Sequence, residues 1–197
     1  MLTAHRKFPR FYHALNAPTW FCAWQGEAFR QALPKWVSLP YRFTGAGSVL
    51  AGGRWSVRRL MPAVYASLSP DTLHAEAFYQ ARHYGWTLAD FKPQTMIGLR
   101  CEFHRIVDLT SRETLKVLGV KTKELVDCNW RAEQAADLEP LTQAIARAAF
   151  ENLAEGLLVP SARHADGINL VYFPSHRRDG TRLEADKESD IPFVHGI

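Results

Sequence analysis

The sequence is poor in cysteine and contains no long apolar run. Its three cysteines, Cys22, Cys101 and Cys128, show no CxxC spacing, so neither a disulfide scaffold nor a structural zinc site is expected. No apolar stretch approaches the roughly 18–20 residues that span a bilayer, and the first residues lack the apolar segment of a secretory signal. These absences predict a globular cytoplasmic protein that does not cross a membrane.

Several common catalytic signatures are also missing. The chain has no GxGxxG, Walker, HExxH or GxSxG motif, which removes the usual dinucleotide-binding, nucleotide triphosphatase, metalloprotease and hydrolase assignments. Its eight histidines are scattered, and no two of them stand at the spacing of metal ligands. No metal site is therefore expected.

What the chain does contain is an ordinary apolar content and a mild positive charge. It has 197 residues, of which 47% are hydrophobic and 22% charged, and this fits one folded domain rather than a disordered or repetitive chain. Lys and Arg number 24 against 20 Asp and Glu, a net charge of +4. The basic residues do not gather into the patch typical of nucleic-acid binding. An anionic small molecule such as a nucleotide fits this charge equally well.

The chain is interpreted as one domain over residues 1–197, because neither a repeat nor a flexible linker divides it. An N-terminal arm, residues 1–38, is rich in aromatic residues, and a core of about 40–178 is followed by a tail, 180–197. The ring surface of the arm must be buried, either in the core of this domain or against a partner.

Helix and strand signals are interleaved without a regular βαβ rhythm, which predicts a mixed α+β sheet. One helix over 70–84 begins at Ser69 followed by proline. Another follows a capping box of Thr110 and Glu113 and is stopped by Gly119. A third spans roughly 139–155, with Gly156 closing it. The strand-like runs are 63–68, 95–103, 105–109, 157–159 and 168–173.

Two arginines flank a glycine-rich segment. Arg42 stands between two aromatic residues, and Arg54 follows Gly52 and Gly53. Glycines let the backbone turn sharply against a ligand, and guanidinium groups bind phosphate through two parallel hydrogen bonds. The pair could therefore clamp a pyrophosphate. The alternative is a hairpin turn with surface arginines.

Glu76 and Ser161 are the other two candidates. Glu76 lies on or beside the inward face of the helix over 70–84, where a carboxylate is costly unless it is paired or used; the alternative is a solvated surface residue. Ser161 directly follows a strand-like run and Pro160, where it could bond a ligand hydroxyl. The alternative is a turn serine, and no neighbouring His–Asp pair marks it as a nucleophile.

In this order, the pieces resemble the RES domain, a family named for an arginine, a glutamate and a serine. The steps from Arg54 to Tyr65 and from Tyr65 to Glu76 are both eleven residues, which is the family's spacing. After GRW the family commonly has Asn and then Gly, whereas this chain continues with SVRR. The matching pieces are YRF (41–43), GGRW (52–55), VYAS (64–67), VPSAR (159–163) and NLVYFPSH (169–176).

The resemblance implies a compact mixed-sheet α+β fold similar to ADP-ribosyltransferases. It also implies the toxin of a bacterial toxin–antitoxin pair that degrades NAD⁺ at the nicotinamide–ribose bond, by hydrolysis or by phosphorolysis. Glu76 would stabilise the oxocarbenium-like ribose, and Arg42 and Arg54 would bind the two phosphates. Tyr65 would stack against nicotinamide, and Ser161 would position the ribose or the amide.

The resemblance further implies the binding partners. NAD⁺ is the substrate, and no other cofactor is expected. The expected partner is an antitoxin with an Xre-type helix-turn-helix domain, whose C-terminal segment would cover the cleft near Arg42 and Arg54. The toxin itself is expected to bind neither nucleic acid nor membrane. Homo- and hetero-oligomers stay open.

Two other functions remain open from the sequence. One is an ADP-ribosyltransferase that modifies a cellular protein from the same pocket. The other is a non-enzymatic interaction module in which Glu76 is structural. Water, phosphate or a protein side chain are all open as the acceptor of the ribose.

Overall fold

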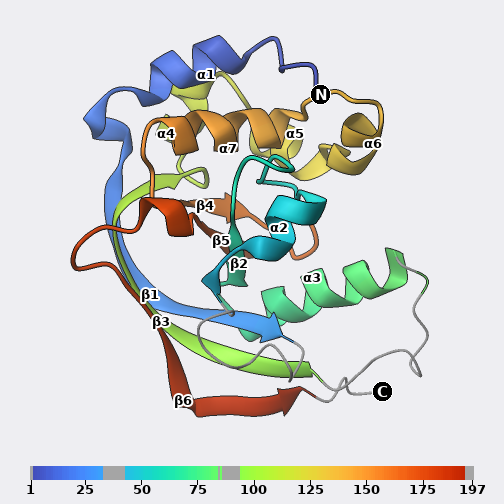
Figure 1. The fold of residues 1–197 in the computed structure, drawn as a ribbon, viewed down its shortest axis with the longest axis vertical. Coiled ribbons are helices and arrows are strands. Elements are labelled where there is room, and N and C mark those ends of the chain that lie inside the picture. Colours follow the sequence, from blue (N-terminus) through green and yellow to red (C-terminus); the bar gives the residue numbers. More distant parts are fainter. Residues whose placement is uncertain (1, 33–42, 84, 86–93, 194–197) are drawn as a thin grey trace.

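The fold is known from a computed structural model that describes residues 2–32, 43–83, 85 and 94–193. Helices and strands are interleaved along the chain (Figure 1). The helices are α1 (Phe8–Leu15), α2 (Ala46–Ala51), α3 (Pro70–His83), α4 (Arg112–Leu118), α5 (Thr122–Asp127), α6 (Trp130–Ala135) and α7 (Leu141–Glu151). The strands are β1 (Cys22–Ala32), β2 (Val64–Ser67), β3 (Gln94–Asp108), β4 (Gly156–Pro160), β5 (Ile168–Tyr172) and β6 (Arg182–Phe193).

The strands form one mixed sheet in the order β1-β2-β5-β4-β3-β6. Among the pairings between these strands, over the residues that the structure describes, only β3–β4 is parallel. Strand β1 pairs with both β2 and β3, so the pairings β1-β2-β5-β4-β3 return to β1 and close a ring. Strand β6 extends β3 outside this ring. The mixed α+β sheet expected from the sequence is confirmed.

One hydrophobic core fills the inside of the curved sheet. Because side chains alternate along a strand, every second side chain points to this side. Residues paired across neighbouring strands point to the same side, so their side chains pack together. We call this set the inner core, and its buried members are Ala28, Val64, Ala66, Ile97, Leu99, Cys101, Phe103, Ile106, Leu158, Leu170 and Tyr172.

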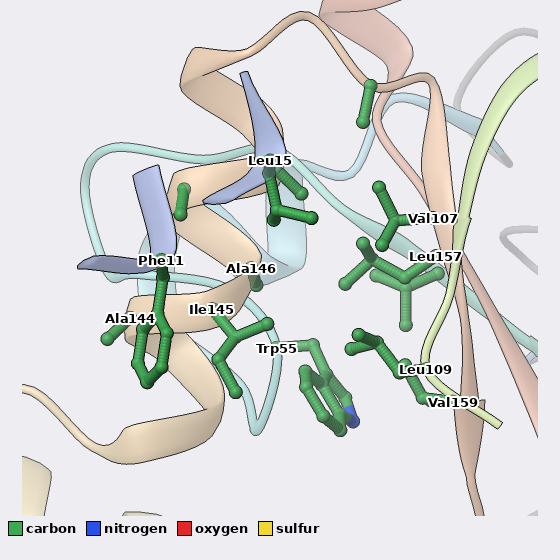
Figure 2. Packing of buried hydrophobic residues seen from close by; sticks show 14 of the residues in the cluster. Phe11, Leu15, Trp55, Val107, Leu109, Ala144, Ile145, Ala146, Leu157 and Val159 are labelled. Carbon is green, nitrogen blue, oxygen red and sulfur yellow. The ribbon is translucent and has the colours of Figure 1, made fainter. Parts of the chain in front are cut away.

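A second core lies between the other face of the sheet and helices α1, α4 and α7. In Figure 1 these helices gather at one end of the molecule, while the long strands β1, β3 and β6 curve toward the opposite end. Figure 2 shows the Trp55 indole in this helical core, with Ile145 of α7 on one side and Leu109 and Val159 on the other. Trp55 is only 3% exposed. Its burial therefore anchors the turn that carries Arg54.

The predicted helices are present, with altered ends. Helix α3 begins at Pro70 after Ser69, whose Oγ accepts the backbone N–H of Thr72 at 3.2 Å, so the predicted cap is confirmed. The capping box at Thr110 is wrong, because its hydroxyl bonds Asp108 and Ser111 precedes the helix.

The third predicted helix, 139–155, is too long. Helix α7 starts only after Pro140, whose backbone is extended (ψ 153°). It ends before Leu153, which takes a left-handed φ of 61°. Gly156 does not close the helix but begins β4.

The strand predictions are confirmed for β2, β4 and β5, while two predicted runs form the single strand β3. Strands β1 and β6 were not predicted. Their sequences, CAWQGEAFRQA and RLEADKESDIPF, mix charges, glycine or proline into the pattern, and these residue types are depleted in strands. Among the described residues, no helix is long and apolar enough to cross a membrane.

The described part of the aromatic arm, residues 2–32, packs on this chain's own core. Phe11 is fully buried, and Phe8, Tyr12, Trp20 and Phe21 pack against the helical core. The ring surface of these residues is therefore buried in the core of this domain, which is one of the two alternatives given by the sequence; the other was burial against a partner.

Candidate functional site

A carboxylate with two side-chain donors stands where β4, β5 and α3 meet. Ser161 Oγ, just after β4, donates to Glu76 Oε1 at 2.7 Å. Asn169 Nδ2, on β5, donates to the same oxygen at 2.9 Å. Glu76 is half-buried on α3. The sequence pattern left Glu76 either inward-facing or solvated, and the structure pairs it with Ser161 over a separation of 85 residues.

The strand register explains this meeting. Asn169 of β5 is paired with Ser67 of β2 on one side and with Val159 of β4 on the other. Because side chains alternate along a strand, Ser161 emerges on the same face as Val159. Ser67 Oγ donates to Asn169 Oδ1 at 2.7 Å. The polar residues therefore form one row across three strands, on the face that also carries the helical core.

The connection after β4 is tied to the start of α3. The backbone N–H groups of Arg163 and His164 both donate to Ser161 Oγ at 3.1 Å. His164 Nδ1 lies 2.8 Å from Thr72 Oγ1 in the first turn of α3, and the Arg163 guanidinium stacks 3.1 Å from the centre of the Tyr79 ring. These contacts fix the position of α3 relative to the connection after β4, and this position determines where the Glu76 carboxylate meets Ser161.

Arg54 reaches the site from a tight turn. Gly53 and Ser56 bridge across this turn, so the hairpin alternative is right about the turn, but Arg54 is half-buried. Its Nη1 donates to the carbonyls of Leu125, Val126 and Cys128 at 2.9, 3.2 and 3.1 Å. Burial lowers the pKa of the Arg54 guanidinium, Arg163 acts in the same direction, and Glu76 opposes both. The group stays charged at any physiological pH.

Tyr65 holds the turn that carries Arg54. Its hydroxyl accepts the Trp55 backbone N–H at 3.1 Å and lies 2.9 Å from Ser56 Oγ. A Cβ at Gly53 would come within 2.5 Å of this hydroxyl oxygen, so only glycine fits there. Burial raises the pKa of the Tyr65 hydroxyl to about 12, although the bonds from Ser56 and Trp55 partly oppose that shift.

Tyr65→Phe is therefore expected to destabilise the protein by about 1–3 kcal/mol, because the Trp55 N–H and the Ser56 hydroxyl lose their partner. It should also change the alkaline limb of stability. The unfolded hydroxyl ionises near 10.0 and the folded one near 12, so wild-type stability falls as the pH rises through this window. Urea unfolding between pH 8 and 11 measures both effects. A mutant with the wild-type alkaline slope would show that Tyr65 does not cause it.

A cavity of about 530 Å³ opens beside Ser161. Its walls are the 160–168 connection together with Thr110, Thr122 and Val126. The Val126 carbonyl is one of the three that Arg54 binds, so the Arg54 turn supports this wall. The cavity gives a polar ligand room next to Ser161, which is the hydrogen-bond donor to Glu76.

The structure thus brings together most of the residues singled out from the sequence. Glu76 and Ser161 are in contact, Arg54 is close enough for its charge to interact with Glu76, and Tyr65 supports the Arg54 turn. Arg42 lies outside the described residues. Among those residues, no three His, Cys, Asp or Glu side chains are placed to share a metal ion.

Sequence reasoning missed Ser67 and Asn169. Each is a polar residue at a strand position whose alternation directs it to the same face as Tyr65 and Val171. This alternation is visible in the sequence, but it identifies Ser67 and Asn169 as neighbours only when β2 and β5 are known to be paired.

The comparisons with known proteins agree with the fold and identify the family. Proteins named NAD(+) phosphorylase MbcT, from Mycobacterium tuberculosis and Mycobacterium bovis, are 26% identical to this chain over 159 residues, covering 73% of it and 76% of each relative. A chain of the crystal structure of the M. tuberculosis MbcT–MbcA toxin–antitoxin complex matches with a TM-score of 0.71 and 20% identity, covering 94% of this chain and 92% of that one. The RES domain family model matches residues 27–194, which include the second half of β1 and all of β6. This chain belongs to the RES domain family.

Proposed function

We propose that this protein degrades NAD⁺ by cleaving its nicotinamide–ribose bond, and that it is the toxin of a toxin–antitoxin pair. The observation that carries the proposal is the Glu76 carboxylate, held by Ser161 beside a half-buried Arg54 in a chain of the RES family. The names of the mycobacterial relatives support the same activity.

The chemistry asks little of the protein beyond a well-placed negative charge. Nicotinamide is a good leaving group, and its departure leaves positive charge on the ribose. Glu76 would stabilise that charge, as carboxylates do in glycoside hydrolysis. Ser161, on the cavity wall, would hold the nicotinamide ribose through its oxygen.

The remaining residues would bind the rest of NAD⁺. Arg54 would hold the phosphates, with Arg42 as the second arginine. The hydroxyl of Tyr65 is engaged by Trp55 and Ser56, so its contribution to the nicotinamide would come from the ring face.

Phosphate is the acceptor that the relatives' name favours. Purified protein should therefore release nicotinamide and ADP-ribose 1″-phosphate from NAD⁺ in phosphate buffer, and turn over slowly without phosphate. Free ADP-ribose at equal rates in both buffers would identify water as the acceptor. Labelled protein in a lysate given labelled NAD⁺ would identify ADP-ribosyl transfer. NAD⁺ that stays intact under all three conditions would overturn the proposal.

An enzyme that depletes NAD⁺ harms its own cell, so an antitoxin should cover the cleft. The neighbouring structure is a toxin–antitoxin complex, which supports such a partner. We expect an antitoxin with an Xre-type helix-turn-helix domain, whose C-terminal carboxylate would mimic the phosphates near Arg42 and Arg54. Co-expression should yield a complex in which NAD⁺ loss is suppressed. Full inhibition by an antitoxin lacking its last residues would exclude this mode.

A further inference from the structure

We infer that Asn169 is a positioning residue for this reaction: it fixes one oxygen of the Glu76 carboxylate so that the other is presented to the ribose. The inference rests on the proposed function, because it concerns how Glu76 acts on NAD⁺. It starts from a hydrogen-bond chain that runs from β2 through β5 to α3.

The two donors to Glu76 are arranged asymmetrically. Ser161 and Asn169 both donate to Oε1, at 2.7 and 2.9 Å, whereas Oε2 accepts no hydrogen bond from any residue that the structure describes. A carboxylate with one donor can rotate about its last bond, because that torsion has a broad energy minimum. Two donors, one on β5 and one just after β4, fix its plane. The lone pairs of Oε2 then stay available for a ligand.

Ser67 fixes the orientation of the Asn169 amide. An amide can present either its oxygen or its nitrogen, and only the nitrogen can donate to a carboxylate. Ser67 Oγ donates to Asn169 Oδ1 at 2.7 Å, which leaves Nδ2 for Glu76. Ser67 is only 3% exposed and is the cross-strand partner of Asn169. The sheet register therefore determines which atom reaches the carboxylate.

A neutral donor suits this position. Arg54 already brings positive charge near Glu76, since the Glu76 carboxylate opposes the lowering of the pKa of the Arg54 guanidinium. A further cation bound directly to the carboxylate would cancel the negative charge that must stabilise the ribose. An amide orients the carboxylate while adding no net charge.

Asn169→Ala is expected to lower kcat about 10–100-fold. Displacing a catalytic group by about 1 Å lowers the rate on the order of a hundredfold. KM for NAD⁺ should change less than about threefold, because the phosphate contacts of Arg54 remain. The matched control is Asn152→Ala. Asn152 Nδ2 also makes two hydrogen bonds, to the carbonyls of Tyr12 and Ala148, but at the end of α7. This control should lose stability and keep kcat.

Asn169→Asp keeps the shape of the side chain and replaces the donor by a second carboxylate. At neutral pH the two carboxylates repel each other and activity should fall. As the pH decreases, the pair takes up one proton, and the introduced carboxyl can then donate to Glu76 as the amide did. The pH optimum should therefore move to a more acidic value than in the wild type. Arg54, Arg163 and His164, the charged and titratable residues around the Glu76–Ser161 contact, are present in both proteins, so they do not produce this difference.

Wild type and Glu76→Gln are assayed first, with folding checked by circular dichroism. If the wild type degrades NAD⁺ while Asn169→Ala keeps the wild-type kcat, or Asn169→Asp keeps the wild-type pH profile, the inference is wrong and the proposed function stands. If the wild type leaves NAD⁺ intact, both are overturned. Should Asn169→Ala fail to fold, the pH profile of the isosteric Asn169→Asp decides.

Discussion

Glu76→Gln is expected to abolish NAD⁺ loss and to leave the fold intact. Glutamine occupies nearly the same volume as glutamate and can still accept hydrogen bonds from Ser161 and Asn169 through its amide oxygen. What it lacks is the negative charge opposite the developing positive charge of the ribose. Loss of such a transition-state interaction typically costs a factor of about 100–1,000. Nicotinamide release by the purified protein measures this effect.

The control for this variant is Glu113→Gln, which makes the same chemical change on the exposed surface of α4. It should retain the wild-type kcat and melting temperature. Wild-type turnover by Glu76→Gln would remove Glu76 from the mechanism, and the interaction-module alternative would then gain.

Arg54→Ala should produce two losses at once. NAD⁺ should bind more weakly because a phosphate contact is gone. The protein should also be less stable, because the carbonyls of Leu125, Val126 and Cys128 lose a charged donor. An unsatisfied buried acceptor costs about 1–3 kcal/mol. Substrate titration measures the first loss, and urea unfolding measures the second.

Arg54→Lys separates these roles. Lysine keeps the charge but not the planar fork, so it should bind NAD⁺ better than the alanine variant and worse than the wild type. Arg58→Ala is the control, since Arg58 is exposed on the same segment and should have little effect. An Arg54→Lys protein with the wild-type KM would argue against a bidentate phosphate contact.

Local sequence signals determined the parts of the fold that depend on neighbouring residues. The Ser69–Pro70 start of α3 and the Gly119 end of α4 could be predicted because each uses a chemical preference at one position. The predicted end of α7 was wrong because the local signal, a glycine, was read without knowledge of the strand pairing. Gly156 resembles a helix stop, but the strand that it joins is specified by pairing with β3 and β5, which no local pattern reveals.

The residues of the site also differ in whether local sequence or tertiary packing identifies them. The family motifs pointed to Glu76 and Ser161, and their contact follows from the structure. Asn169 and Ser67 could not be chosen from the sequence, because their contact depends on the register of β2 against β5, 102 residues apart. The same holds for Arg54. Its glycine-rich turn was visible, whereas its bonds to the end of α5 depend on tertiary packing.

The distance along the chain between Glu76 and its two donors also has a consequence for synthesis in the cell. Glu76 leaves the ribosome well before Asn169, which follows it by 93 residues. At translation rates of about 5–20 residues per second, roughly 5–20 s separate the two. A nascent chain therefore carries the carboxylate without the groups that orient it, and the proposed activity cannot appear until Asn169 has also been made and has folded against β2.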